Sequence, residues 1–174
     1  MTTDMTFSPP VPASTDALRR TYIETLQDLH RTEQALLDAL CAWCSAATES
    51  TRALFARRLE HTRAQAIRLG GLLHRLDAPL DAGACAAVHA ELQAARDAVR
   101  GCPRGARRDT LLLNTAERLK LHQLRQYEAA CRYALILNDE EAFGVLMLAL
   151  ADERTSEYIV QYLSDGDWPG DPAH

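Results

Sequence analysis

Apolar side chains recur every three or four residues along most of this chain, the spacing that places them on one face of an α-helix. The clearest case is residues 109–137, which contain neither glycine nor proline. No segment shows the strict apolar–polar alternation of a strand, so the pattern predicts an all-α protein. The apolar stripe of residues 109–137 comprises Leu112, Ala116, Leu119, Tyr127, Ala130, Ala134 and Leu137.

The same spacing predicts three more long helices and one short helix. We expect the long helices over residues 15–47, 51–76 and 140–164, with the short helix over residues 84–100. On the last helix, the side chains expected to face inward are Phe143, Leu146, Met147, Leu150 and Val160. Ser14, Thr15 or Asp16 can cap the first helix, and the Asn-Asp pair at 138–139 can cap the last. Gly70 and Gly71 lie inside the second helix, where they suggest a close helix crossing.

These elements form two helical hairpins joined by a long crossover over residues 77–108. Four long helices with one long middle connection are typical of the ferritin-like four-helix bundle. We therefore predict a ferritin-like helical bundle over residues 15–164, with the short fifth helix in the crossover. The polar, proline-rich residues 1–14 predict a disordered leader, and the turn-rich residues 165–174 predict a flexible tail.

Composition and charge narrow the function classes. The net charge of −5 provides no basic field for nucleic acid or for an anionic membrane surface. No apolar run reaches the roughly 18 residues of a membrane span, and the N-terminus lacks the basic and apolar regions of a signal peptide. Five cysteines without a framework spacing fit a reducing compartment. The sequence thus predicts a cytoplasmic protein that binds neither nucleic acid nor membranes.

The cysteines and most histidines give weak signals for chemistry. Cys41 and Cys44 form a C-x-x-C, but within a predicted helix, so we interpret them as small buried hydrophobes and leave a redox role open. Cys102 is expected in an exposed turn. Four histidines lack mutual metal-ligand spacing and are interpreted as flank residues: His30, His74, His89 and His122.

Several long polar side chains fall on core-facing stripes near the middle of the four long helices. Such side chains require partners, because a buried polar group without one costs free energy. Arg58 and His61 lie beside this set on the second helix, and Arg154 lies on a flank of the last helix. The inward set comprises Glu33, Gln65, Lys120, Gln123, Glu153 and Glu157.

If these side chains face inward, two interpretations stay open; a third is that the helical phases differ and the groups extend to solvent. In the first, Lys120 pairs with Glu33, Glu153 or Glu157 in a buried polar network, where its ammonium supplies the positive charge that a metal would supply. In the second, one metal ion, iron or manganese, binds the carboxylates together with a histidine. The residues of this second site would be Glu33, His61, Glu153 and Glu157.

Several short motifs resemble the YciE/YciF-like ferritin-like proteins, which are associated with bacterial stress responses. The similarity spans about residues 18 to 163. It includes Leu-His-Arg-Thr-Glu ending at Glu33, Arg-Leu-Glu-His-Thr beginning at Arg58, Cys85 in the crossover, and Ala-Asp-Glu-Arg around Glu153. The resemblance implies a scaffold for a di-metal site.

The sequence departs from this family pattern in the helix over residues 109–137. Where the family has Glu-His-Tyr-Glu, the chain has Lys-Leu-His-Gln, so a cation at Lys120 and an amide at Gln123 replace two glutamates. His61 likewise replaces a carboxylate. The implied metal site is therefore degenerate, and no cofactor is expected.

We accordingly expect a non-enzymatic ferritin-like bundle with a stress-associated structural or protein-interaction role and no catalytic or cofactor-binding residues. The alternative is a metal-binding protein with iron- or manganese-dependent oxidase or peroxide-handling activity, an oxidoreductase. A homodimer or an unidentified protein partner is compatible with either hypothesis.

Overall fold

The computed structural model describes residues 14–80 and 85–164, with side chains as far as residue 155. Five helices occupy these ranges, and no strand occurs in them. The predicted leader and tail lie outside the described residues, apart from Ser14. The helices are α1 (Thr15–Ala46), α2 (Glu49–Arg75), α3 (Ala86–Arg100), α4 (Ala106–Ile136) and α5 (Glu140–Ser164).

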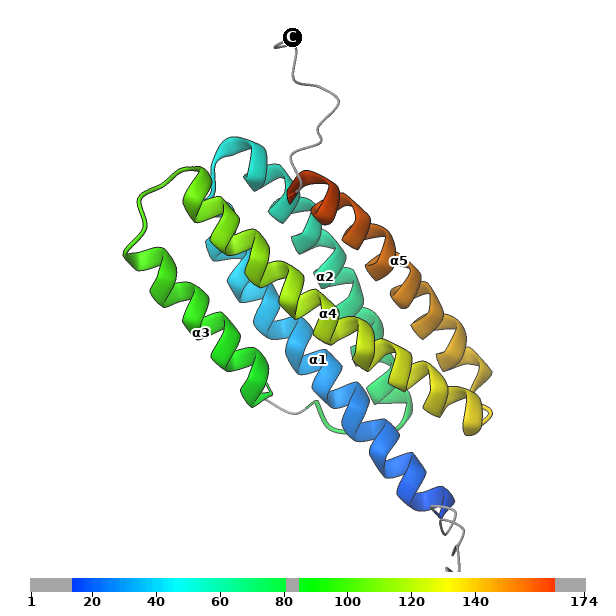
Figure 1. The fold of residues 1–174 in the computed structure, drawn as a ribbon. Coiled ribbons are helices and arrows are strands. Elements are labelled where there is room, and N and C mark those ends of the chain that lie inside the picture. The colour runs from blue at the N-terminus through cyan, green and yellow to red at the C-terminus, as the bar shows by residue number, and fades with distance from the viewer. Residues whose placement is uncertain (1–13, 81–84, 165–174) are drawn as a thin grey trace, which may run out of the picture.

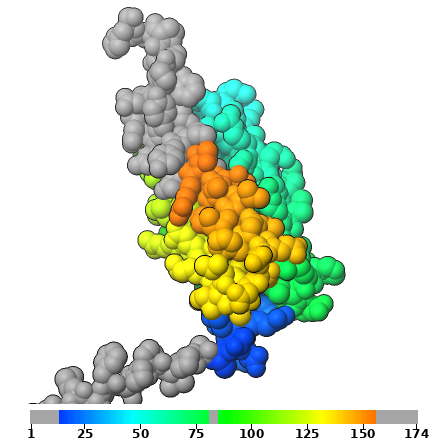
Figure 2. All heavy atoms as spheres, turned by 90° about the vertical axis from the view of Figure 1, so that its right-hand side faces the viewer, coloured from blue at the N-terminus to red at the C-terminus, as the bar shows by residue number. Residues whose placement is uncertain are grey.

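The four long helices lie side by side as two hairpins, and α3 lies outside them (Figure 1). The first hairpin is α1 with α2, and the second is α4 with α5. Helix α3 packs on α4 and α1, while α5 packs on α4 and α2, and Figure 2 views the face on which α5 lies between these two helices. Within the described residues, no helix is long and apolar enough to cross a membrane. The arrangement confirms the predicted helical bundle.

Hydrogen bonds at the helix ends explain where the elements begin. The backbone N–H of Ala17 donates to Ser14 Oγ at 3.2 Å, so Ser14 caps α1. Asp139 caps α5 by accepting from Ala142 N at 3.2 Å. The turn predicted at residues 48–50 is shorter, because buried Asp109 accepts from Thr48 N at 3.1 Å and from its hydroxyl. Helix α2 therefore begins at Glu49, earlier than predicted.

The apolar core has two parts, separated along the bundle axis. The first part lies among α1, α2, α4 and α5, and its largest buried members include Tyr22, Leu26, Leu73, Tyr127 and Leu146. The second part lies among α1, α2, α3 and α4. Its members include Leu36, Trp43, Phe55, Leu92 and Leu112.

Four sequence expectations were wrong in detail. Cys41 is exposed and Cys44 half-buried, so the C-x-x-C is not a pair of core hydrophobes. Cys102 is buried rather than exposed, and His30 is also buried rather than on a flank. Met147 was expected on the inner stripe of the last helix, yet 40% of it is exposed, whereas Leu146 and Leu150 of the same stripe are buried as expected.

The two glycines in α2 do not enforce a close helix crossing. A Cβ added at Gly70 would meet His30 Nε2 at 3.7 Å, an ordinary van der Waals contact. One added at Gly71 would meet nothing within 4 Å. Either position has room for alanine, so the interpretation of a glycine-dependent crossing was wrong.

Candidate functional site

A layer of polar side chains lies between the two parts of the apolar core. Each of the four long helices contributes to it: Glu33 from α1, Arg58 from α2, Lys120 and Gln123 from α4, and Glu153 from α5. Glu33, Gln123 and Glu153 are 0% exposed, and Lys120 is 3% exposed. Polar groups this deeply buried cost free energy unless they find partners, so their contacts within the layer decide its charge state.

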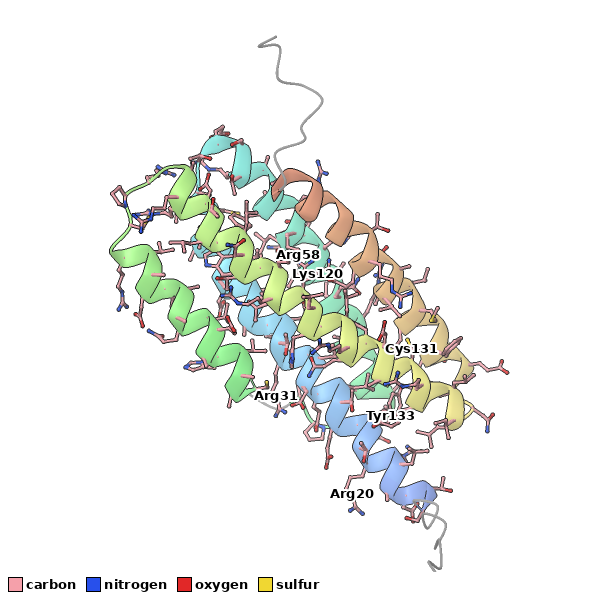
Figure 3. All side chains as sticks on the ribbon, in the orientation of Figure 1. Arg20, Arg31, Arg58, Lys120, Cys131 and Tyr133 are labelled. Carbon is pink, nitrogen blue, oxygen red and sulfur yellow. The ribbon has the colours of Figure 1, made fainter. Side chains whose placement is uncertain are left out.

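Glu153 forms the charged end of the layer. Lys120 Nζ lies 2.8 Å from Glu153 Oε2, and Arg58 Nη2 lies 3.1 Å from the same oxygen. Arg58 and Lys120 approach each other near the middle of the bundle, from α2 and α4 (Figure 3). One carboxylate oxygen therefore contacts two cations from two different helices.

Glu33 forms the other end of the polar layer, and the side chains that donate hydrogen bonds to it are neutral. Gln123 Nε2 donates to Glu33 Oε1 at 2.7 Å, and the Tyr127 hydroxyl donates to the same oxygen at 2.9 Å. Arg58 Nη2 also donates to Gln123 Oε1 at 2.7 Å. This bond joins the two ends, so the layer is one continuous chain of polar contacts across the bundle.

The two carboxylates respond to their surroundings in opposite directions. Burial raises the pKa of Glu33, the negative charge of Glu153 raises it further, and it reaches about 8. Burial also acts to raise the pKa of Glu153, but the charges of Arg58 and Lys120 outweigh burial and hold that pKa below its usual value. Near pH 7 the layer thus holds a neutral Glu33 beside an ionised Glu153.

Only some of the site residues predicted from the sequence lie in this layer. The structure brings together Glu33, Lys120, Gln123 and Glu153, but the ammonium of Lys120 contacts Glu153, and Glu33 connects to that pair through Gln123 and Arg58. Gln65 is buried and accepts from Arg68 Nη1 at 3.2 Å, on its own helix. His61 is half-buried on α2. The side chain of Glu157 lies outside the described residues.

Tyr127 is the member of the layer that sequence reasoning missed. Its position on the apolar stripe led us to treat it as a core hydrophobe, and its ring is fully buried as expected. The available signal was its hydroxyl, since a buried tyrosine usually finds a hydrogen-bond partner. Gln123 lies one helical turn before Tyr127 on the same face of α4, and it indicates where along the bundle the partner of the hydroxyl lies.

The residues of the layer do not fit the di-metal centre that the ferritin-like resemblance implies. Such a centre uses about four carboxylates and two histidines. Here two of the positions on α4 hold Lys120 and Gln123, and Arg58 approaches from α2, so the positive charge already comes from side chains. Within the described part of the chain, no group of three His, Cys, Asp or Glu residues is arranged to hold a metal ion.

Comparisons place the chain among known folds. The family described as a domain of unknown function (DUF892) matches residues 17–165. The structure of the E. coli stress protein YciF has a TM-score of 0.79 at 20% identity, with 86% of this chain and 95% of that chain covered.

A second structure, YcfI from Rhodopseudomonas palustris, has a TM-score of 0.77 at 17% identity, with 87% of this chain and 97% of that chain covered. No curated protein sequence matches the chain. Identities this low establish the ferritin-like helical fold and leave the function to be argued from the site.

Proposed function

The chain belongs to the DUF892 family, and on that premise we propose that it is a non-catalytic ferritin-like scaffold whose own side chains replace the metal centre. The observation that carries this proposal is the contact of Glu153 Oε2 with both Lys120 and Arg58. Two fixed cations stabilise the buried carboxylate as a metal ion would, and they cannot dissociate. A divalent ion placed beside them would meet like charges.

The scaffold would then act through its surface, as a structural or partner-binding protein. The two similar structures agree with such a role: one is described as a stress protein, and the description of the other proposes a structural role. We extend these descriptions to this chain as a proposal that it acts during stress. A strain that lacks the protein should lose survival under stress, and the Lys120→Glu variant should restore less of it than the wild type.

We propose a second copy of the chain as the partner. Large apolar side chains are exposed on the neighbouring helices α2 and α5, with Ile67 70% and Leu148 64% exposed. Arg68 and Asp152, joined at 3.1 Å, show that these parts of the two helices are adjacent. Light scattering should give a dimer for the wild type and a monomer for Leu148→Glu, and a monomeric wild type would contradict this assignment.

The experiment that tests the scaffold proposal measures metal per chain. The protein is purified after growth with added iron and manganese, and elemental analysis should give near zero. The Lys120→Glu, Gln123→Glu double variant restores the two glutamates of the family pattern, so it should gain metal. Stoichiometric metal in the wild type would contradict the scaffold proposal.

The competing function is a metal-dependent oxidase or peroxide-handling enzyme that uses Glu33, His61, Glu153 and Glu157. One observation favours it: Glu33 Oε2 and Glu153 Oε1 have no hydrogen-bond partner among the described residues, so each retains an oxygen able to bind a cation. Metal in the wild type, lost in Glu33→Gln and in His61→Ala, would support this function. Ferrous-iron oxidation and peroxide assays would then identify the reaction.

A further inference from the structure

A small pocket lies between α2 and α4, next to the charged end of the polar layer. Its wall is mainly apolar and consists of Leu54 and Phe55 from α2 with Leu113 and Ala116 from α4. Arg58 and Lys120, the two cations that contact Glu153, also line it. The space open to the centre of a water molecule is about 40 Å³.

An apolar wall with cations beside it is the kind of site that binds an amphipathic anion. Apolar walls gain free energy by covering hydrocarbon, while a cation buried beside them attracts a negative group more strongly than it would in water. Both described contacts of Arg58 use Nη2, and its guanidinium carries further N–H donors on Nε and Nη1.

Glu117 is the charged group in the pocket wall that opposes an anion. It is half-buried, so water reduces the effect of its charge on the pocket. Lys120 is 3% exposed by comparison, and its Nζ is paired with Glu153 at 2.8 Å. Arg58, whose described contacts use Nη2 alone, is therefore the cation of the wall that we assign to an anion.

We propose that this pocket binds a small carboxylate with a short aliphatic chain, its carboxylate directed at Arg58 and its chain between Leu54 and Leu113. A buried water needs about 10–15 Å³ by the same measure, so the enclosed space holds on the order of three non-hydrogen atoms. A chain of that size fits, with the rest of the molecule at the mouth. The site goes beyond the scaffold role, which assigns no small molecule to the chain.

Pentanoate is the probe, and 1-pentanol is its uncharged counterpart of equal chain length. Chemical-shift changes in a backbone amide NMR titration should saturate with pentanoate and centre on residues of the pocket wall in α2 and α4. Pentanol should bind about tenfold more weakly, because it lacks the charge-assisted hydrogen bonds. Failure of pentanoate to saturate the shifts, or equal binding of the alcohol, would overturn the proposal.

Three variants locate the binding. Ala116→Leu fills the pocket and changes no residue of the polar layer, and it should weaken pentanoate binding at least about tenfold. Ala64→Leu is the matched control, since Ala64 is exposed on α2 outside the pocket wall, and it should bind as the wild type does. Glu117→Gln should tighten pentanoate binding and leave pentanol binding unchanged, because it removes the opposing charge.

Unchanged binding in Ala116→Leu, or weaker binding in Glu117→Gln, would place the ligand elsewhere and overturn the assignment. Neither outcome bears on the scaffold proposal, which is decided by metal content. The tightening expected of Glu117→Gln cannot come from a damaged fold, so one of the three variants tests the site even if the filled pocket destabilises the protein.

Discussion

The two glutamates of the polar layer make an instructive pair. Glu33 and Glu153 have the same side chain, both are 0% exposed, and one chain of polar contacts joins them. Their pKa values nevertheless move in opposite directions, upward for Glu33 and downward for Glu153. Burial is common to both, so the difference comes from their partners: two cations contact Glu153, whereas a neutral amide and a phenol contact Glu33.

This difference shows how a ferritin-like bundle can keep carboxylates in its core without a metal. One carboxylate is held as an ion by positive charge that the protein itself supplies. The other is stabilised as a neutral acid, because full burial beside a second carboxylate disfavours its charge. Substitutions that remove these causes one at a time should separate their effects on stability.

Glu153→Gln should have the largest effect on stability. It removes the ionised carboxylate that Lys120 and Arg58 both contact, so the buried position that two cations share loses its negative charge. We expect the free energy of unfolding in denaturant to fall by about 4–5 kcal/mol. Arg154→Gln is the control: Arg154 forms an exposed ion pair with Glu128 at 2.7 Å, and its loss should cost under about 1 kcal/mol. Equal losses would mean that water reaches Glu153.

Lys120→Met should cost less, about 3 kcal/mol near neutral pH, because Arg58 still contacts Glu153. The loss should shrink as the pH falls and Glu153 becomes protonated. Combining Lys120→Met with Glu153→Gln removes one cation and one anion together, so the double variant should be more stable than Glu153→Gln alone. Additive losses in this double-mutant cycle would show that the two side chains do not interact.

The helical pattern of the sequence was sufficient to predict the fold and the position of the polar layer along the bundle axis. Apolar spacing located all five helices within a few residues of their observed ends, since each long helix buries one continuous stripe. The same helical spacing placed four polar residues on core-facing sides, and all four are buried: Glu33, Lys120, Gln123 and Glu153. Periodicity is sufficient there because it fixes the direction of a side chain from its own helix.

The pairing within the layer did not follow from the sequence. Which cation meets which carboxylate depends on how the helices are rotated and shifted against one another, and no single helix specifies that. Lys120 therefore could not be assigned to Glu153 rather than to Glu33, and the link through Arg58 and Gln123 was not foreseen. Met147 was misplaced for a related reason, because α5 is apolar on both faces and its wheel has no clear polar side.

Glu33→Gln tests the neutral end of the layer through its pH dependence. Because the folded pKa of Glu33 is raised to about 8, the stability it contributes is full below its unfolded pKa and is lost as the pH rises toward 8. Glutamine imitates the neutral acid at every pH. The wild type should therefore lose stability relative to Glu33→Gln as the pH rises, by up to about 1.4 kcal/mol per pH unit.

The measurement is a series of denaturant titrations between pH 5 and pH 9, with Glu24→Gln as the matched control on the exposed face of α1. The difference between the wild type and Glu24→Gln should stay flat across the series. If the curve for Glu33→Gln also ran parallel to that of the wild type, Glu33 would be ionised in the folded protein, and the contrast with Glu153 would disappear.

Tyr127→Phe should have the smallest effect, a loss of about 1 kcal/mol, because it deletes one neutral hydrogen bond while Gln123 still donates to Glu33 Oε1. The bond from Tyr127 lowers the pKa of Glu33, so its removal should also move the pH dependence of stability toward higher pH. Tyr133→Phe is the matched control, because Tyr133 lies half-buried on the same helix and its hydroxyl has no hydrogen bond among the described residues. It should change neither the free energy of unfolding nor its pH dependence. A shift toward lower pH in Tyr127→Phe would mean that the phenol stabilises the neutral acid, and that the neutrality of Glu33 depends on this partner rather than on burial.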